Sequence, residues 1–282
     1  MRTKKSLGQH FLNSPKIIGD IVSAGKVTKG DLVLEIGPGE GTLTSALLKT
    51  GASVVTVEKD DRLIPILQEK FEKEILSRQL TLIHNDILNV NISKTVFDIK
   101  KSYKIIANIP YYITGQIIRM FLETHRQPES MTLLVQKEVA ERVVARDGKE
   151  SLLSLSVKVY GEPKIIRVVG RGAFTPQPNV DSAVLVIEDI SRNVLTRAPL
   201  VNFKSYKGRP CKTNEKRFFE IIHAGFAHKR KQLLSNLKKA KLGSRASKLD
   251  DAFKNLGINP KSRAEDLPLE TWLKLCNILS VC

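Results

Sequence analysis

A glycine-rich segment and an acidic residue further along the chain have the spacing of an adenosine-binding site. The segment "EIGPGEG" (35–41) places three glycines after an apolar run, where backbone N–H groups can approach a charged ligand. Glu58 lies 21 residues beyond Gly37 and ends the next apolar run, where a carboxylate can bind both hydroxyls of a ribose. The segment lacks the Lys-Ser/Thr pair of a phosphate-binding loop. NAD and S-adenosylmethionine satisfy this pattern equally, and a tight turn with a solvent-exposed strand end is the structural alternative.

Two further polar residues end apolar runs in the same way. Asp86 can accept a hydrogen bond from an adenine amino group, or it can cap a helix that begins at the next residue. Asn108 ends the run "YKIIAN" and is followed by "IPYY". By itself this segment predicts either a turn or a site for a flat polar ring. The set of Gly37, Glu58, Asp86 and Asn108 is more specific than any of its members.

Strands that alternate with helices must position these residues. The apolar periodicity predicts strands over 31–37, 53–60, 80–86, 103–108 and 131–137, and helices over 15–24, 42–52, 61–76, 116–125 and 138–146, with Pro65 near a kink. Such alternation predicts an α/β fold with a doubly wound parallel sheet, covered by helices on both faces. Ligands of these sheets bind at the carboxyl ends of the strands, so we expect the four residues to lie together there.

The pattern changes after about residue 150. A helix-like run at 151–161 precedes two runs, 164–170 and 182–189, that are typical of a strand pair. Residues 189–213 have little periodicity, and from Asn214 the chain is predicted to be helical and basic. We therefore predict a catalytic, cofactor-binding domain over 1–190, a linker or surface loop over 191–213 and a smaller all-helical domain over 214–282.

The net charge of +17 is concentrated near the end of the chain. Residues 191–282 hold 20 Lys and Arg against 7 Asp and Glu, a net charge of +13, whereas residues 1–190 carry only +4. Such asymmetry indicates a polyanionic partner, and we expect nucleic acid. The segments "HKRK" (228–231) and "LKKAKL" (237–242) are candidates for phosphate contacts; a solvated helix face is the alternative.

Several classes of protein are excluded by composition. No apolar stretch approaches the roughly 20 residues that a membrane-spanning helix needs. The basic N-terminus lacks the apolar region of a secretory signal. The three cysteines, Cys211, Cys276 and Cys282, are too few and too scattered for a disulfide framework or a zinc site. We therefore expect a cytoplasmic protein without a bound metal.

Motifs along the whole chain resemble those of the ribosomal RNA adenine N6-dimethyltransferase family. They appear in order: "GQHFL" (8–12), "EIGPGEGTLT" (35–44), "VEKD" (57–60), "ND" (85–86), "NIPYYI" (108–113), "QKEVAERV" (136–143), "FTPQPNVDS" (174–182), "HKRKQLLSNL" (228–237) and "RAEDLPLETWLKL" (263–275). The pairing of "NIPY" with "FTPxPxVDS" is very specific. Within the family, the chain resembles the bacterial small-subunit branch, and residues 189–213 are the least characteristic.

The resemblance implies a Rossmann-like S-adenosylmethionine methyltransferase domain followed by a helical RNA-binding domain. It implies transfer of two methyl groups to N6 of each of two adjacent adenines near the 3′ end of 16S rRNA. The substrate would be 16S rRNA within a pre-30S particle, during biogenesis of the 30S subunit, and the protein a monomer. The target base must leave its stack to reach such a site.

The resemblance also implies roles for individual residues. The side-chain oxygen of Asn108 and a backbone carbonyl, that of Ile109 or of Pro110, would accept hydrogen bonds from the reacting amine. Tyr111 would stack on one face of the base and Phe174 would cover the other, although Phe174 could equally be a core residue. Contacts with S-adenosylmethionine are implied for His10, Leu12, Gly37, Glu58, Asp86 and Asn108. Relatives often carry Asn at position 10, so His10 contributes through either its side chain or its backbone.

Two other functions are compatible with the same motifs. One is the sister group that dimethylates a single large-subunit adenine; the segments "EIGPGEG", "FTP" and "RAEDLPLETW" favour the small-subunit branch. The other is a non-catalytic RNA-binding or transcription factor that retains the fold. The intact "NIPY" segment argues against lost catalysis.

Overall fold

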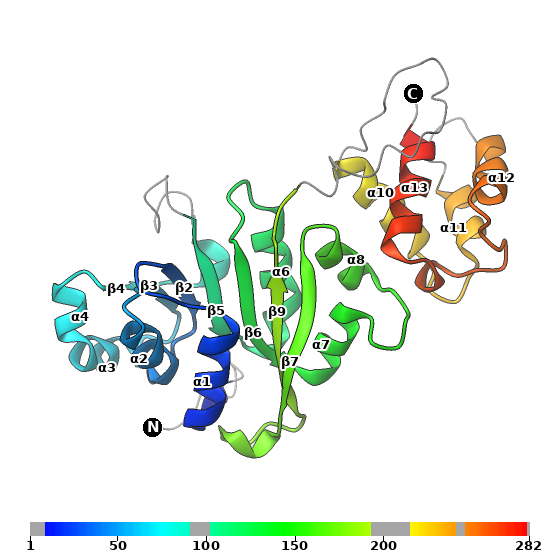
Figure 1. Cartoon of the computed structure of the whole chain (residues 1–282). Coiled ribbons are helices and arrows are strands. Elements are labelled where there is room, and N and C mark those ends of the chain that lie inside the picture. Colours follow the sequence, from blue (N-terminus) through cyan, green and yellow to red (C-terminus); the bar gives the residue numbers. More distant parts are fainter. Residues whose placement is uncertain (1–8, 91–101, 193–214, 241–245, 281–282) are drawn as a thin grey trace. The chain divides into compact units, whose positions relative to one another are not determined.

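The computed structural model describes residues 9–90, 102–192, 215–240 and 246–280 (Figure 1). The chain forms two compact units, Met1–Ala140 with Glu162–Ile190, and Glu141–Gly161 with Ser191–Cys282. Most of the predicted linker therefore lies outside the described residues. Residues 141–161, predicted to belong to the first domain, make contacts within the second unit. For example, the Tyr160 hydroxyl donates to Glu215 Oε1 at 2.6 Å.

A seven-stranded sheet with the order β4-β3-β2-β5-β6-β9-β7 forms the centre of the first unit. Its parallel strands are β2 (Leu32–Ile36), β3 (Ser53–Glu58), β4 (Leu80–His84), β5 (Lys104–Asn108) and β6 (Ser130–Gln136). Strand β9 (Ser182–Glu188) lies between β6 and β7 (Glu162–Val169) and runs antiparallel to both, so β7 has the same direction as the other five strands. The sheet is therefore mixed rather than wholly parallel, because no crossover helix joins β7 to β9. The predicted α/β class and the strand pair are confirmed.

Helices cover both faces of this sheet, as predicted (Figure 1). Helix α1 (Pro15–Ala24) packs against β6, and α2 (Thr42–Lys49) packs against β3. Helix α6 (Thr114–Glu123) lies on the opposite face from α1, and α7 (Lys137–Val144) follows β6. Strand β5 is buried on both faces, with Ile105 and Ile106 each 0% exposed, and this double burial explains its continuous apolar sequence.

The single helix predicted over 61–76 is divided in the structure. Helix α3 (Ile64–Lys70) ends at Phe71, which is buried and has a non-helical backbone, and α4 (Glu72–Leu76) follows. Pro65 lies in the first turn of α3 rather than at a kink. A proline is tolerated there because the first N–H groups of a helix have no partner within the helix.

In the second unit, every regular element that the structure describes is helical. These helices are α8 (Leu152–Lys158), α10 (Glu215–Gly225), α11 (Leu233–Lys239), α12 (Ala246–Asn255), α13 (Leu269–Ser280), the 3₁₀ helix η5 (Ala264–Asp266) and the end of α7. The region from residue 214 is helical, as predicted, and between α10 and α11 Asn236 Nδ2 donates to the carbonyls of Gly225 at 2.7 Å and His228 at 3.1 Å. These bonds hold a tight connection between α10 and α11. The segment 228–231 therefore lies in that connection and not on a helix face.

Gly225 provides a stability test of this unit. A Cβ atom at Gly225 would lie 2.4 Å from the fully buried Trp272 ring and 2.9 Å from Leu233. We expect Gly225→Ala to lower the free energy of unfolding by about 1–3 kcal/mol in urea denaturation, because the core would be overpacked. Gly19→Ala is the matched control: nothing lies within 4 Å of its added Cβ, and alanine stabilises a helix interior by about 0.5–1 kcal/mol. Equal midpoints for the two variants would contradict this packing.

None of the helices in the described ranges is long and apolar enough to cross a membrane.

Candidate active site

A pocket lies at the carboxyl ends of the parallel strands in the first unit. Its empty volume is about 1200 Å³, which includes space open to solvent. Gly37, Glu58, Asp86 and Asn108 all line it, together with His10, Leu12, Pro110 and Tyr111. Because parallel strands end at the same edge of the sheet, residues that are far apart in sequence meet here.

The glycine-rich turn between β2 and α2 forms one wall of the pocket. Gly37 has a φ of +68°, and its N–H donates to the Val57 carbonyl at 2.9 Å. Gly41 has a φ of +76°, and a Cβ atom there would lie 2.5 Å from the Phe71 ring. Only glycine fits such a position without strain, so the turn brings bare backbone and the start of α2 to the pocket.

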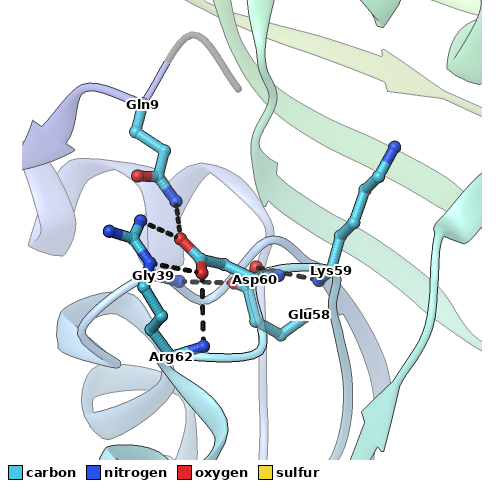
Figure 2. Close-up of polar contacts among 6 residues, drawn as sticks. All are labelled: Gln9, Gly39, Glu58, Lys59, Asp60 and Arg62. Atoms are coloured by element: carbon cyan, nitrogen blue, oxygen red, sulfur yellow. Dashed lines mark hydrogen bonds and ion pairs between the residues drawn. The ribbon is translucent and has the colours of Figure 1, made fainter. Parts of the chain in front are cut away.

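Glu58 is held by backbone N–H groups at the end of β3 (Figure 2). Its Oε1 accepts from the N–H groups of Lys59 at 2.8 Å and Asp60 at 2.7 Å, and its Oε2 accepts from Gly39 at 3.3 Å. Burial raises the pKa of the Glu58 carboxyl, whereas these three donors oppose the shift. The carboxylate is therefore fixed in one orientation, and its remaining lone pairs can accept hydrogen bonds from a ligand.

Asp86 caps a short helix, as one of its two predicted roles requires, and it also reaches the pocket. Its Oδ1 accepts from the Leu88 N–H at 3.0 Å and so caps the short 3₁₀ helix η2 (Ile87–Asn89). Its Oδ2 pairs with Lys59 Nζ at 2.7 Å, and this lysine holds the pKa of Asp86 below its usual value. Asp86 also lines the pocket, one strand away from Glu58.

Asn108 ends β5 with its side-chain amide anchored on one side. The Nδ2 atom donates to the His10 carbonyl at 3.1 Å. Among the residues that the structure describes, none donates a hydrogen bond to Asn108 Oδ1. The Nδ2 donor of Asn108 is therefore bonded within the protein, and its Oδ1 acceptor can accept a hydrogen bond from another partner.

Tyr111 begins the 3₁₀ helix η3 (Tyr111–Ile113) directly after Pro110. Its hydroxyl lies 2.7 Å from Ser182 Oγ, and its ring stacks on the His10 ring with centroids 5.8 Å apart and an interplanar angle of 23°. Burial raises the pKa of the Tyr111 phenol. The ring is thus a neutral, partly buried surface of fixed orientation at the pocket.

Residues 9–12, which we call the N-terminal strap, cross to the pocket from a distant part of the sequence. Within the strap, β1 (Phe11–Leu12) pairs antiparallel with β8 (Phe174–Thr175). His10 Nδ1 lies 2.7 Å from the Pro176 carbonyl, so the His10 ring is occupied by protein contacts. Leu12 is 6% exposed and lines the pocket.

Phe174 is the one predicted site residue that the structure does not bring to the pocket lining. It is 4% exposed and belongs to the same buried cluster as Leu12 and Ile18. Its position corresponds to the alternative of a core residue, beneath the strap. The pairing of β8 with β1 places the Phe174 side chain inside this cluster.

Glu35 also lines the pocket, although the sequence patterns predict no role for it and it stands at the start of the glycine-rich segment 35–41. It is 1% exposed and lines the pocket. Thr44 Oγ1 donates to its Oε2 at 2.7 Å, and its Oε1 has no hydrogen-bond partner among the described residues. The available signal was a carboxylate inside the otherwise apolar run "LVLEI". A buried carboxylate without full hydrogen bonding is costly and marks a functional position.

Glu35 predicts a pH dependence of stability. Burial raises the pKa of Glu35 from 4.5 to about 7. The folded state therefore binds the proton more tightly than the unfolded chain, and this contribution is lost as the pH rises from about 4.5 through 7. Relative to Glu35→Gln, we expect the free energy of unfolding to fall by up to about 3 kcal/mol between pH 5 and pH 8. Urea denaturation of both proteins tests this difference, and parallel pH profiles would contradict it.

Comparisons with known proteins define first a class and then a family. The chain matches two solved structures over almost its whole length. A 23S rRNA methyltransferase, ErmE, superposes with a TM-score of 0.72 at 24% identity over 95% of this chain and 99% of that one. A dimethyladenosine transferase from Plasmodium falciparum superposes with a TM-score of 0.75 at 27% identity, over 94% and 96%. The fold is thus that of Rossmann-like methyltransferases.

The family follows from sequence. The family model described as ribosomal RNA adenine dimethylase matches residues 1–280. A ribosomal RNA small subunit methyltransferase A from Dehalococcoides mccartyi is 41% identical over 98% of this chain and 88% of its own length. One of the same description from Clostridium botulinum is 38% identical, over 98% and 93%. The chain belongs to the ribosomal RNA adenine dimethylase family, and it is an S-adenosylmethionine-dependent methyltransferase that acts on ribosomal RNA.

The residues of the pocket fit this cofactor. The Glu58 carboxylate is held in one orientation and is an acceptor of the kind that ribose hydroxyls require, and the backbone at Gly37 carries no side chain that would fill the space beside it. The orphaned Oε1 atom of Glu35 offers a further acceptor for a polar group of a ligand. When bound, S-adenosylmethionine supplies an electrophilic methyl group on a sulfonium centre.

Proposed function

We propose that this protein transfers two methyl groups to N6 of each of two adjacent adenines near the 3′ end of 16S rRNA. The substrate is the rRNA within a pre-30S particle, and the protein acts as a cytoplasmic monomer. The proposal is supported by relatives named for the small subunit, which match 98% of the chain at 41% and 38% identity. The single observation that carries the chemistry is the anchored amide of Asn108 at the pocket.

Asn108 provides the acceptor that the reacting amine needs. The lone pair of an adenine N6 amine is delocalised into the ring, so the amine is a poor nucleophile. Two acceptors that hold both of its N–H groups favour a pyramidal nitrogen whose lone pair points at the methyl group. Asn108 Oδ1 is one acceptor in this proposal. The Ile109 carbonyl is the better second one, because the Pro110 carbonyl already accepts from the Ile113 N–H at 3.2 Å. The rate gain comes from positioning and electrostatics.

Tyr111 provides the surface on which the flipped base stacks. Stacking of a base on an aromatic ring is worth roughly 1–3 kcal/mol, comparable to the cost of taking the base out of the helix. The hydrogen bond to Ser182 and the contact with His10 hold the ring in place before the base arrives. Because Phe174 is buried in the core cluster, the proposal assigns it the support of the strap rather than direct contact with the base.

The cofactor roles follow from the contacts in the pocket. Glu58 binds the ribose hydroxyls, Asp86 accepts from the adenine amino group, and the backbone at Gly37 approaches the charged end. Leu12 supplies an apolar contact. Both the carbonyl and the ring of His10 already contact protein groups. We therefore assign His10 a positioning role rather than a side-chain contact with the cofactor.

The connection between α10 and α11 supplies candidate phosphate contacts. Lys229, Arg230 and Lys231 are exposed there. The neighbouring Lys239 lowers the pKa of Lys231, so two ammonium groups lie close together. Lys238 is instead paired with Asp250 at 2.8 Å. A phosphodiester bound between Lys231 and Lys239 would relieve their repulsion, and contacts of this kind set affinity and salt dependence rather than sequence choice.

Removing this cation pair should weaken RNA binding without changing catalysis. For the double variant Lys231→Ala/Lys239→Ala we expect a roughly tenfold higher Kd for rRNA near 150 mM salt and a salt-dependence slope smaller by about 1–2. Filter binding over a salt series measures both. Lys238→Ala is the matched control, because its ammonium group is already neutralised, and it should change the slope by less. An unchanged slope in the double variant would remove this site from the proposal.

Methylation of isolated 30S and 50S precursors with labelled S-adenosylmethionine tests which ribosomal subunit contains the substrate rRNA. The proposal predicts label in 16S rRNA, recovered as N6,N6-dimethyladenosine at two adjacent positions. Label confined to the large subunit would contradict it and favour the sister group. Normal RNA binding with no label in either subunit would favour a non-catalytic RNA-binding protein.

A further inference from the structure

Gln9 joins the N-terminal strap to the loop that follows β3 (Figure 2). Its Nε2 donates to Asp60 Oδ2 at 2.8 Å, across 51 positions of sequence. Asp60 is 1% exposed, and its side chain is fully buried. A hydrogen bond to a buried carboxylate is stronger than one between neutral groups, so this contact can hold a short segment in place.

Asp60 is itself a rigid anchor. Arg62 donates to its Oδ1 from Nε at 2.9 Å and from the backbone at 3.2 Å, and it pairs with Oδ2 at 2.6 Å. These contacts, with a smaller contribution from Gln9, hold the pKa of Asp60 well below its usual value. The carboxylate is therefore ionised throughout the working pH range, and its position is determined by Arg62. Gln9 is the partner that comes from the strap.

The anchor stands between two functional groups of the pocket. The Asp60 N–H donates to Glu58 Oε1 at 2.7 Å, on the cofactor side. On the other side, Gln9 is followed by His10, whose carbonyl accepts from Asn108 Nδ2 at 3.1 Å. A continuous set of contacts thus runs from the proposed ribose acid to the proposed acceptor of the reacting amine. Displacing the strap at Gln9 would displace the carbonyl that orients the Asn108 amide.

We propose that Gln9 is a positioning residue whose hydrogen bond to Asp60 fixes the strap, so that the His10 carbonyl holds Asn108 Oδ1 toward the substrate amine. This inference rests on the proposed role of Asn108. Gln9 acts through other residues and does not itself take part in the reaction. The competing explanation is that the bond only ties down the N-terminal segment.

An isosteric series at Gln9 separates these explanations. Gln9→Met keeps the size of the side chain but has no donor. We expect it to lower kcat about tenfold because the amide loses its orientation, while the KM for rRNA stays within error of the wild type. A residue that only ties down the N-terminal segment would change the melting temperature and leave kcat at saturating substrate unchanged.

Gln9→Glu adds a test by pH. At neutral pH the new carboxylate faces the ionised Asp60, and the repulsion should lower kcat further than Gln9→Met does. Proximity to Asp60 raises the pKa of the new glutamate, so on acidification it becomes protonated and can again donate to Asp60. We expect the ratio of kcat for Gln9→Glu to that of the wild type to rise about threefold from pH 8 to pH 6. The same ratio for Gln9→Met, which has no titrating group at this position, should stay flat.

Failure of the role inferred for Gln9 can be distinguished from failure of the role proposed for Asn108. A Gln9→Met variant with wild-type kcat, or a flat ratio for Gln9→Glu, overturns this inference alone if Asn108→Ala is inactive. If Asn108→Ala remains active, the proposed function of Asn108 fails, and the role of Gln9 fails with it.

Discussion

Asn108→Ala is expected to lower the rate of methyl transfer by at least 10²–10³-fold, the size of effect seen when one preorganised hydrogen-bonding group is removed from an active site. The variant removes Oδ1, and with it the acceptor that holds the reacting amine. Affinity for rRNA should be unchanged, because the pocket binds a single base whereas Lys and Arg side chains outside it bind the phosphate backbone of the RNA. Single-turnover methylation of 30S precursors measures the rate, and filter binding measures the affinity.

Two further variants make this result specific. Asn108→Asp keeps acceptors but loses the donor to the His10 carbonyl, so the group should lose its orientation and most of its activity. Asn13→Ala is the matched control: its side chain donates to Thr175 Oγ1 at 2.8 Å, outside the pocket lining, and we expect near wild-type rates. Methylation by Asn108→Ala within a few fold of the wild type would remove the assigned role.

Glu58→Ala is expected to raise the Kd for S-adenosylmethionine by roughly 30- to 140-fold, the cost of one charged hydrogen-bonding group at about 2–3 kcal/mol. The variant removes the acceptor for the ribose hydroxyls. It also leaves the N–H groups of Gly39, Lys59 and Asp60 without their side-chain acceptor. Isothermal titration calorimetry measures the Kd. The rate at saturating cofactor should change much less, because Glu58 is not placed at the reacting amine.

Glu58→Gln and Glu72→Ala complete this experiment. The glutamine keeps one acceptor and should give an intermediate Kd. Glu72 is an exposed residue in α4 and does not line the pocket, so its replacement should leave the Kd unchanged. A Kd for Glu58→Ala within threefold of the wild type would show that the carboxylate does not bind the ribose.

The sequence could predict that four polar residues meet at the strand ends, because this depends only on local periodicity and on the rule that parallel strands end at the same edge of a sheet. Gly37, Glu58, Asp86 and Asn108 each follow an apolar run, and parallel strands bring such ends together. The strap could not be predicted in this way. Its contacts with Asp60, Asn108 and Pro176 join distant segments, and the sequence of residues 9–12 has no periodicity that would predict these contacts.

The structure differs from the sequence-based predictions in three other places, and in each the cause is a contact between distant segments. The sheet gains one antiparallel strand, β9, because the chain returns after β7 without a crossover helix. Helix α10 ends at Gly225, whose carbonyl accepts a hydrogen bond from Asn236, eleven residues further along the chain. Phe174 is buried because β8 pairs with the strap and not with the rim of the pocket. In each case a tertiary contact decides between alternatives that the local sequence leaves open.

A crystal structure with S-adenosylhomocysteine and adenosine would show whether Asn108 holds the exocyclic nitrogen of an extruded adenine beside the cofactor. We expect N6 of the adenosine to lie about 2.8–3.1 Å from Asn108 Oδ1, with Nδ2 still bonded to the His10 carbonyl. An adenosine bound elsewhere, or an amide turned so that Nδ2 faces N6, would show that Asn108 does not hold the reacting amine.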